Sequence, residues 1–170
     1  MITVTSAQAN KLLNKLNDDV AALYRNEQQC ARYIAAVGEQ LEDARPEYDF
    51  ETVRIAIATL EEKVRIVKHA INVFNTTTEV PETGMTIDQV LVLIPQYTKS
   101  KARLADMKSK LPKERQATGI RTGTIEYMYA NYSINAAKAA YDDVTAKLAN
   151  IQNALDTVNN TVTFTIDVDI

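Results

Sequence analysis

Glu27, Cys30 and His69 are the side chains whose types could do chemistry. A carboxylate with a raised pKa can act as a general base, and a thiolate beside an imidazole can act as a nucleophile. The predicted helix geometry places His69 opposite an apolar seam and Cys30 beside Val64, so no Cys-His pair is expected. One cysteine and one histidine also leave a zinc site without its usual ligands. We therefore predict that the chain is not an enzyme and that it binds no metal or cofactor.

Glu27 is the one charged residue on the apolar seam of the first predicted helix. The pairing expected for that helix puts Glu27 near Val67, with Lys63 and Lys68 within side-chain reach. We interpret Glu27 as a polar layer that fixes the register of two packed helices. The alternative, a buried general base, lacks a second acid or base to cooperate with it.

A run of positive charge between Lys99 and Arg121 is the other candidate site. It holds eight basic residues and two acidic ones, a local balance of +6 in a chain whose net charge is −3. One interpretation is a phosphate-binding surface, with Tyr127, Tyr129 and Tyr132 nearby as stacking groups. The interpretation we favour is a solvated helix end, where the helix dipole stabilises cations. The basic residues are Lys99, Lys101, Arg103, Lys108, Lys110, Lys113, Arg115 and Arg121.

Composition places these candidates on a mainly helical chain. The 170 residues are 46% hydrophobic and 24% charged, with four glycines, four prolines and no tryptophan, which favours long helices with few interruptions. We expect one domain, because this length is ordinary for a single core. No stretch approaches the roughly 18 to 20 apolar residues that span a bilayer, and the first ten residues lack a secretion signal. We therefore predict a cytoplasmic protein without a membrane span.

Three of the four predicted helices have apolar residues at alternating steps of three and four, which is the spacing of a coiled-coil seam, and the third has apolar residues from Ile87 to Leu111 without that strict alternation. Cap residues mark all four starts: Ser6, Asp49 and Ser133 are expected caps, and Thr86 with Gln89 forms a capping box. Pro95 lies inside the third segment, where we expect it to kink or split the helix. The predicted helices cover residues about 6–44, 49–74, 87–111 and 134–159.

The first two predicted helices are joined by about four residues, so they must form an antiparallel hairpin. Facing residue numbers should then sum to about 94, which places Leu23 beside Ile71. At about 1.5 Å per residue the first helix, near 58 Å long, outreaches the second, near 38 Å long. Ala9, Leu13 and Leu16 would then lack cover within the hairpin.

Short segments of alternating apolar residues predict strands at the ends of the helices. We expect the N-terminal strand, the Thr-rich connection and the tail to meet at one end as a small sheet. The predicted fold is mainly α, with long antiparallel coiled-coil hairpins that form a four-helix bundle-like domain with short β segments at its ends. The predicted strands cover residues about 2–5, 75–80, 125–130 and 162–169.

The segment KHAINVFNTTTEV, from Lys68 to Val80, precedes a Thr-opened helix, a basic loop, the segment TIEY and a last helix that ends at Val158 and Asn159. This order, from about Val64 to the C-terminus, resembles a family of small uncharacterised bacterial helical proteins, some of which are labelled septicolysin. The resemblance implies a helical hairpin fold without an assigned activity.

These patterns favour an interaction or scaffold protein over a catalyst. Apolar surface left uncovered by the hairpins predicts self-association into a homo-oligomer, with a protein partner as a further expectation. The alternative function is nucleic-acid or polyanion binding through the basic segment between Lys99 and Arg121.

Overall fold

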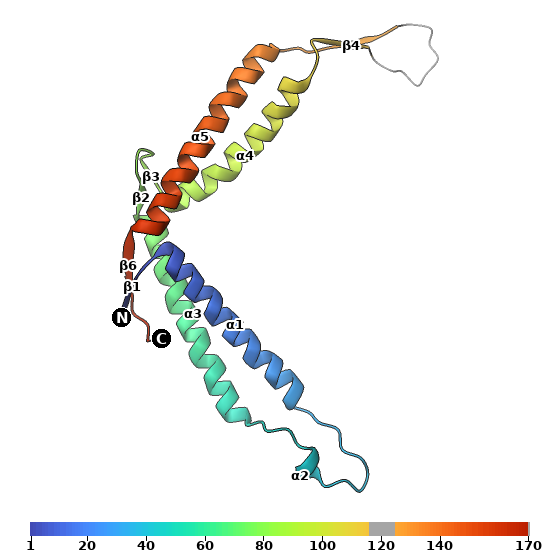
Figure 1. Cartoon of the computed structure of the whole chain (residues 1–170), viewed down its shortest axis with the longest axis vertical. Helices are drawn as coiled ribbons and strands as arrows, with labels where there is room; N and C mark the ends of the chain where they lie inside the picture. Colours follow the sequence, from blue (N-terminus) through green and yellow to red (C-terminus); the bar gives the residue numbers. More distant parts are fainter. Residues whose placement is uncertain (116–124, 170) are drawn as a thin grey trace. The chain divides into compact units, whose positions relative to one another are not determined.

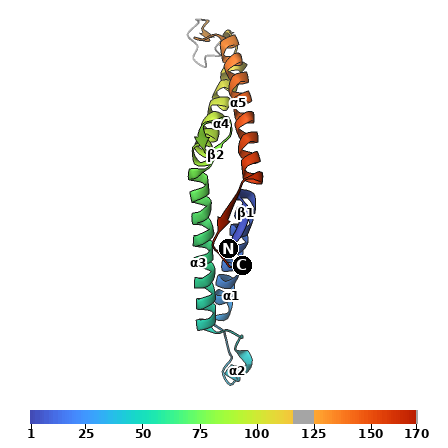
Figure 2. The ribbon, with the colours of Figure 1, turned by 90° about the vertical axis from the view of Figure 1, so that its left-hand side faces the viewer.

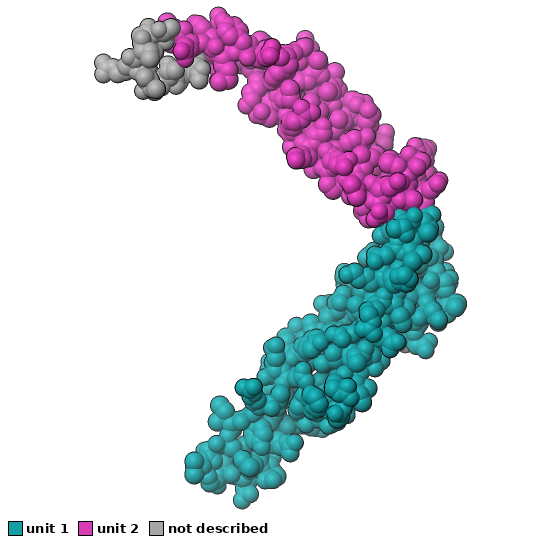
Figure 3. All heavy atoms as spheres, turned by 180° about the vertical axis from the view of Figure 1, so that it is seen from behind, with its two compact units in different colours: residues 1–77, 158–170 teal, residues 78–157 magenta. Residues whose placement is uncertain are grey.

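The computed structural model describes residues 1–115 and 125–169. The chain is mainly helical and divides into two compact units, which Figure 3 shows in different colours. Unit 1 comprises Met1–Thr77 and Val158–Ile170, and unit 2 comprises Thr78–Thr157. We expected one domain with a four-helix bundle. The bundle is not confirmed, because close helix packing is shown for α1 on α3 in unit 1, whereas α4 and most of α5 belong to unit 2.

Unit 1 is a helical hairpin closed by a short antiparallel ribbon. Helices α1 and α3 pack side by side, and strands β1 and β6 pair next to them (Figure 1). The strand β1 occupies the range that the sequence predicts. The elements of this unit are β1 (Ile2–Thr5), α1 (Ser6–Cys30), α2 (Leu41–Ala44), α3 (Phe50–Thr77), the end of α5 (Ile134–Thr161) and β6 (Thr163–Ile166).

The core of unit 1 is built by three elements that are distant in the sequence. Residues of both helices and of the C-terminal tail form one buried cluster, and burial of these side chains is the main stabilising term. Beside the cluster, the ring of Phe74 stacks on that of Phe164 with their centroids 4.4 Å apart. The cluster consists of Ala9, Leu16, Val67, Ile71, Ile166 and Val168.

The tail, predicted as a strand without an evident partner, pairs with the N-terminal strand. Ile2 lies opposite Ile166, and Thr5 lies opposite Thr163. The N-terminal ammonium also donates to the carbonyl oxygen of Val168 at 3.5 Å. The two ends of the chain therefore lie close together beside α1 and α3, as Figure 2 shows.

The expected small sheet forms from the N-terminal strand and the tail, but the Thr-rich connection does not join it, because that connection folds back on itself. Strand β2 (Glu79–Val80) pairs with β3 (Met85–Thr86) in unit 2. The tight turn between them needs left-handed backbone at Glu82 and Gly84, both at φ 64°, and glycine adopts that region without strain. Of the predicted strand 75–80, residues 75–77 are instead the end of α3, where the hydroxyls of Thr76 and Thr77 donate to helix carbonyls, and only Glu79–Val80 form a strand.

The predicted helix 6–44 is wrong beyond Cys30, where α1 ends. Residues 31–40 are irregular, Gly38 has a φ of 92°, and only the short α2 follows before α3. α3 begins only at Phe50. A helix continued to Ala44 would run past the start of α3, and its last turns would have no packing partner there.

The register of the hairpin also differs from the prediction. The hydroxyl of Tyr24 donates to a carboxylate oxygen of Glu61 at 2.9 Å, and these residue numbers sum to 85 rather than 94. The shift slides the start of α1 along α3, so Ala9 and Leu16 are buried among α3 and the tail. The start of α1, which we predicted to lack cover, is therefore covered. This register buries more apolar surface than the predicted one, and burial of apolar surface stabilises the fold.

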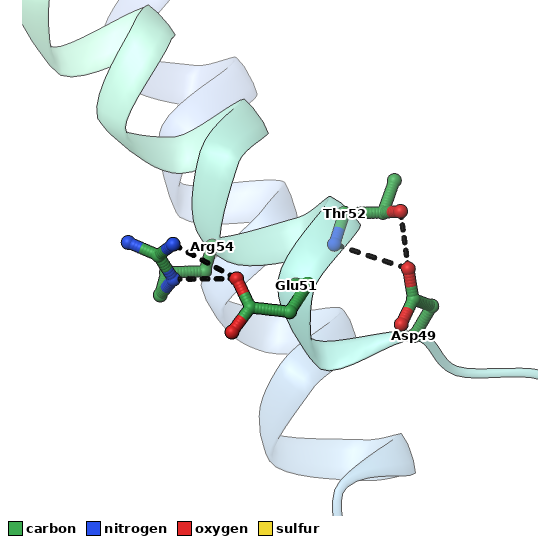
Figure 4. Close-up of polar contacts among 4 residues, drawn as sticks. All are labelled: Asp49, Glu51, Thr52 and Arg54. Atoms are coloured by element: carbon green, nitrogen blue, oxygen red, sulfur yellow. Dashed lines mark hydrogen bonds and ion pairs between the residues drawn. The ribbon is translucent and has the colours of Figure 1, made fainter.

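The start of α3 shows the cap that the sequence predicts (Figure 4). One oxygen of the Asp49 carboxylate accepts hydrogen bonds from the backbone N–H of Thr52 at 3.1 Å and from its hydroxyl. These two donors lower the pKa of Asp49 below its usual value. Glu51 pairs with Arg54 at 2.8 Å on the exposed side of the first turn.

Unit 2 is a second hairpin, made by α4 and α5, which lie side by side in Figure 1. Thr86 and Gln89 form the predicted capping box at the start of α4. The helix continues through Pro95, so the predicted split does not occur, although a proline removes one backbone hydrogen bond. Besides β2 and β3, this unit holds α4 (Ile87–Ser109), β4 (Lys113–Arg115), β5 (Tyr127–Tyr129) and most of α5.

Candidate functional site

The basic segment spans two elements of unit 2. Four of its residues lie on α4, Lys110 follows the helix, and Lys113 and Arg115 lie on β4. Arg121 lies outside the residues that the structure describes. The four residues on α4 are Lys99, Lys101, Arg103 and Lys108.

Two of these lysines point at an aromatic ring of the opposite helix. The ammonium of Lys108 lies 3.2 Å from the centre of the Tyr141 ring, and that of Lys101 lies 5.9 Å from it. Both lysines are half-buried, and Tyr141 belongs to α5. Cation–π attraction thus ties α4 to α5. This role of Tyr141 could not be predicted from the sequence, because it depends on how α4 and α5 are aligned.

Lys110 is also engaged within its own helix end. Its ammonium pairs with the Asp106 carboxylate at 2.7 Å, a spacing of one helical turn, with both side chains more than half exposed. The hydrogen bond and the nearby negative charge raise the pKa of Lys110. Lys99 and Arg103 are exposed on α4. The cations of the segment therefore do not form one continuous free surface.

The β4–β5 ribbon separates its residues into two faces. Residues directly opposite in an antiparallel pair point to the same side, and Lys113 faces Tyr129 while Arg115 faces Tyr127. The remaining pair, Glu114 with Met128, points to the other side. We call the set Lys113, Arg115, Tyr127 and Tyr129 the basic–aromatic face.

The basic–aromatic face is open to solvent. The two tyrosine side chains are 44% and 62% exposed, and their ring centroids lie 6.4 Å apart. The ammonium of Lys113 lies 4.1 Å from the centre of the Tyr127 ring and 5.5 Å from that of Tyr129. Within the two strands the only carboxylate is that of Glu114, on the opposite face. This face is therefore a positively charged aromatic surface.

A hollow of about 350 Å³ lies at the base of the ribbon. It is lined by the end of α4 and by residues of both strands, among them Met107, Leu111 and Met128. Tyr132 also lines it, and its hydroxyl donates to the carbonyl oxygen of Met107 at 2.8 Å. This bond makes Tyr132 a structural link rather than the stacking group that the sequence analysis considered.

The remaining candidates do not meet in one place. Glu27 accepts a hydrogen bond from the Tyr48 hydroxyl at 2.9 Å. This bond links the residues just before α3 to the last turns of α1. Burial and this bond raise the pKa of Tyr48. Cys30 is a half-buried free thiol, and His69 is exposed as predicted. Among residues 1–115 and 125–169, no three His, Cys, Asp or Glu side chains are grouped as metal ligands.

None of the helices in the described part of the chain has the length and apolarity needed to span a membrane.

Comparisons with known proteins show the fold and leave the function open. No protein-family model matches the chain, and no curated protein matches it. Among solved structures, the chain is similar to a crystal structure described as that of a functionally unknown conserved protein from Corynebacterium diphtheriae. The two share 16% sequence identity, and the match covers 96% of this chain and 100% of that chain with a TM-score of 0.61. A likeness at this identity concerns the fold alone.

Proposed function

We propose that the chain is an interaction protein that self-associates through the connecting segment, residues 31–44. The observation that carries this proposal is the exposure of its apolar side chains. Ile34 is 95% exposed, Val37 is fully exposed and Leu41 is 57% exposed. Exposed apolar residues at regular spacing mark interaction surfaces. No chemistry is assigned to the protein, and the likeness to the septicolysin-labelled family stays a prediction.

The spacing of these residues suits a helix that lacks its partner. Steps of three and four place Ile34, Val37 and Leu41 on one face of a helix. Within unit 1 that face has nothing to cover it, because α3 starts only at Phe50. Pairing with another apolar surface would stabilise a helix in this segment, because irregular segments can fold when they bind a partner.

A second copy of the chain fits this surface better than an unrelated partner. When two copies pair antiparallel about a two-fold axis, residue numbers sum to about 75 and Ile34 lies on the partner's Leu41. Val37 then lies beside its own copy, so the apolar row matches itself. The same register places Arg32 beside the partner's Asp43, twice by symmetry. No like charges face each other in this register.

Sedimentation velocity at micromolar concentration tests the proposal. We expect a dimer for the natural chain and a shift toward monomer for the double variant Ile34→Gln with Val37→Gln, because two apolar anchors are lost. The matched control is Leu91→Gln with Val92→Gln, which alters exposed apolar residues of unit 2. Circular dichroism should show helix content that rises with protein concentration.

Charge reversal tests the antiparallel register. Arg32→Asp should weaken the dimer, and Arg32→Asp combined with Asp43→Arg should restore it. A stable monomer at micromolar concentration would contradict the proposal. So would a dimer whose stability is unchanged by the Ile34/Val37 double variant and by the charge reversals.

A second candidate function is the binding of anionic polymers through the basic segment. The favouring observation is the basic–aromatic face, where Lys113 and Arg115 are exposed without a carboxylate on the same side of the ribbon. Binding to heparin that weakens steeply with salt would support it. The absence of binding at low salt would remove it.

A further inference from the structure

We infer that the basic–aromatic face of the β4–β5 ribbon binds single-stranded nucleic acid. This inference rests on the second proposed function, anion binding, and narrows it to one class of ligand. It concerns Lys113, Arg115, Tyr127 and Tyr129, all of which are exposed. It does not depend on the self-association of the connecting segment.

The two tyrosines supply a platform on which bases can stack. They are two residues apart on one strand, so both rings stand on the same side of the ribbon, with centroids 6.4 Å apart. Tyr129 also lines the hollow at the base of the ribbon, and both tyrosine side chains are around half exposed. Aromatic rings on a strand surface stack bases of any sequence, because every base has a π-face.

The two cations supply the contacts to phosphate. Lys113 and Arg115 alternate with the outward-facing Glu114 along β4, so both lie on the tyrosine side. Backbone phosphates of a strand whose bases stack on Tyr127 and Tyr129 would therefore run past these side chains. By the alternation of the strand, Glu114 lies on the other side of the ribbon, where it lines the hollow at the ribbon's base.

Lys113 at present lies over the rings, so a base must displace it. A cation–π contact at an exposed site is worth roughly twofold to fivefold in an equilibrium constant. Stacking of one base on an aromatic side chain is worth roughly fivefold to over a hundredfold. Base stacking therefore prevails, and the displaced ammonium of Lys113 becomes available to a phosphate.

A single strand suits this face better than a duplex. Bases in a duplex are already stacked on each other, so their π-faces are closed to the tyrosines. Duplex affinity then depends on phosphate contacts, and the face offers two cations, which is few for that purpose. Base stacking on the tyrosines is therefore the contribution that makes the affinity for a single strand higher than that for a duplex.

Fluorescence anisotropy with a labelled oligothymidine of about 15 nucleotides tests the inference on the full chain. We expect it to bind more tightly than a duplex of equal length. Tyr127→Ala with Tyr129→Ala should weaken binding by about tenfold or more, because both stacking rings are lost. Tyr127→Phe with Tyr129→Phe is the matched control, which keeps the rings and should keep the affinity.

The cations are tested by the salt dependence of binding. Lys113→Gln with Arg115→Gln should weaken binding and lower the slope of log affinity against log salt by about 0.7 per removed charge. Lys11→Gln with Lys15→Gln, exposed on α1 of unit 1, is the matched control and should leave the slope unchanged. Far-ultraviolet circular dichroism of each variant shows that the helices remain folded.

The possible outcomes separate this inference from the function on which it rests. Heparin or duplex bound as tightly as the oligothymidine, without dependence on Tyr127 and Tyr129, would retain anion binding and overturn the inference. Absence of binding to all three would overturn both. Binding to phosphatidylserine vesicles but not to the oligothymidine would assign the face to membranes and likewise overturn the inference.

Discussion

The β1–β6 ribbon of unit 1 and the β4–β5 ribbon of unit 2 are both short antiparallel pairs beside a helical hairpin. In unit 1 the ribbon and the tail after it turn Ile166 and Val168 into the core, and Phe164 stacks on Phe74 of α3. In unit 2 all six residues of β4 and β5 are exposed. The same local structure therefore closes one hairpin and leaves an open face on the other.

The difference shows that strand pairing alone does not decide the role of a ribbon. A two-stranded ribbon is marginal in water unless it packs against another element. Apolar residues on the inward side of β6 meet α1 and α3, so that ribbon contributes to stability. The exposed side of the β4–β5 ribbon carries Lys113 and two tyrosines, which suit contact with a ligand. Substitutions in the two ribbons should therefore have opposite consequences for stability and binding.

The largest expected effect is on the stability of unit 1. Ile166→Ala should lower the free energy of unfolding by about 2–5 kcal/mol, because it leaves a cavity in a closed core. The matched change in the exposed ribbon, Met128→Ala, should stay within about 0.5 kcal/mol. Urea unfolding followed by circular dichroism measures both. An equal loss of unfolding free energy for the two variants would show that the two ribbons are equally buried, contrary to this comparison.

The capping boxes provide a feature that the two units share, so substitutions in them should have equal effects. Thr5 with Gln8 caps α1, and Thr86 with Gln89 caps α4, each directly after a strand. Thr5→Ala and Thr86→Ala should each cost about 1 kcal/mol, since one helix N–H loses its acceptor. The serine variants keep the hydroxyl and should show little change in thermal unfolding. A loss in only one unit would argue against equivalent caps.

The smallest expected effect is a difference in acid sensitivity between the units. Asp49 caps α3 in unit 1, whereas the hydroxyl of Ser133 caps α5 in unit 2 and does not titrate in acid. Because the folded pKa of Asp49 is lowered, its stabilising contribution is present above the unfolded pKa. That contribution is lost as the pH falls through the folded pKa.

Unfolding measured between about pH 5 and pH 2 tests this acid effect. Asp49→Asn keeps a capping side chain that does not titrate, so it should flatten the acid dependence of unit 1. Ser133→Asn should leave the acid dependence of unit 2 as it is. An unchanged acid profile for Asp49→Asn would show that other carboxylates dominate.

Local signals in the sequence predicted the helices well where a cap and a seam occurred together. Asp49, Thr86 and Ser133 mark the starts of α3, α4 and α5, because a side-chain acceptor at that position satisfies a helix N–H whatever the rest of the chain does. The seam of the first helix was correct up to Cys30 and wrong beyond it. Periodicity shows which face of a helix is apolar, but not whether another element covers that face.

The candidate site was predicted only in outline. The charge run identified Lys113 and Arg115, and alternation around residue 127 identified a strand. The sequence analysis did not predict β4, and therefore could not place these cations on the tyrosine side of a ribbon. Nor could it show that Lys101 and Lys108 are engaged by Tyr141 of α5, because that contact depends on how two distant segments are aligned.

The sequence by itself determined that the chain is mainly helical, where most helices begin, and that its two ends form strands. Each of these depends on neighbouring residues through caps, spacing and alternation. Only the tertiary structure decided the register of α1 on α3, the pairing of β1 with β6, and which face of the β4–β5 ribbon is open. These follow from burial of apolar surface between segments far apart in the chain, which no local pattern specifies.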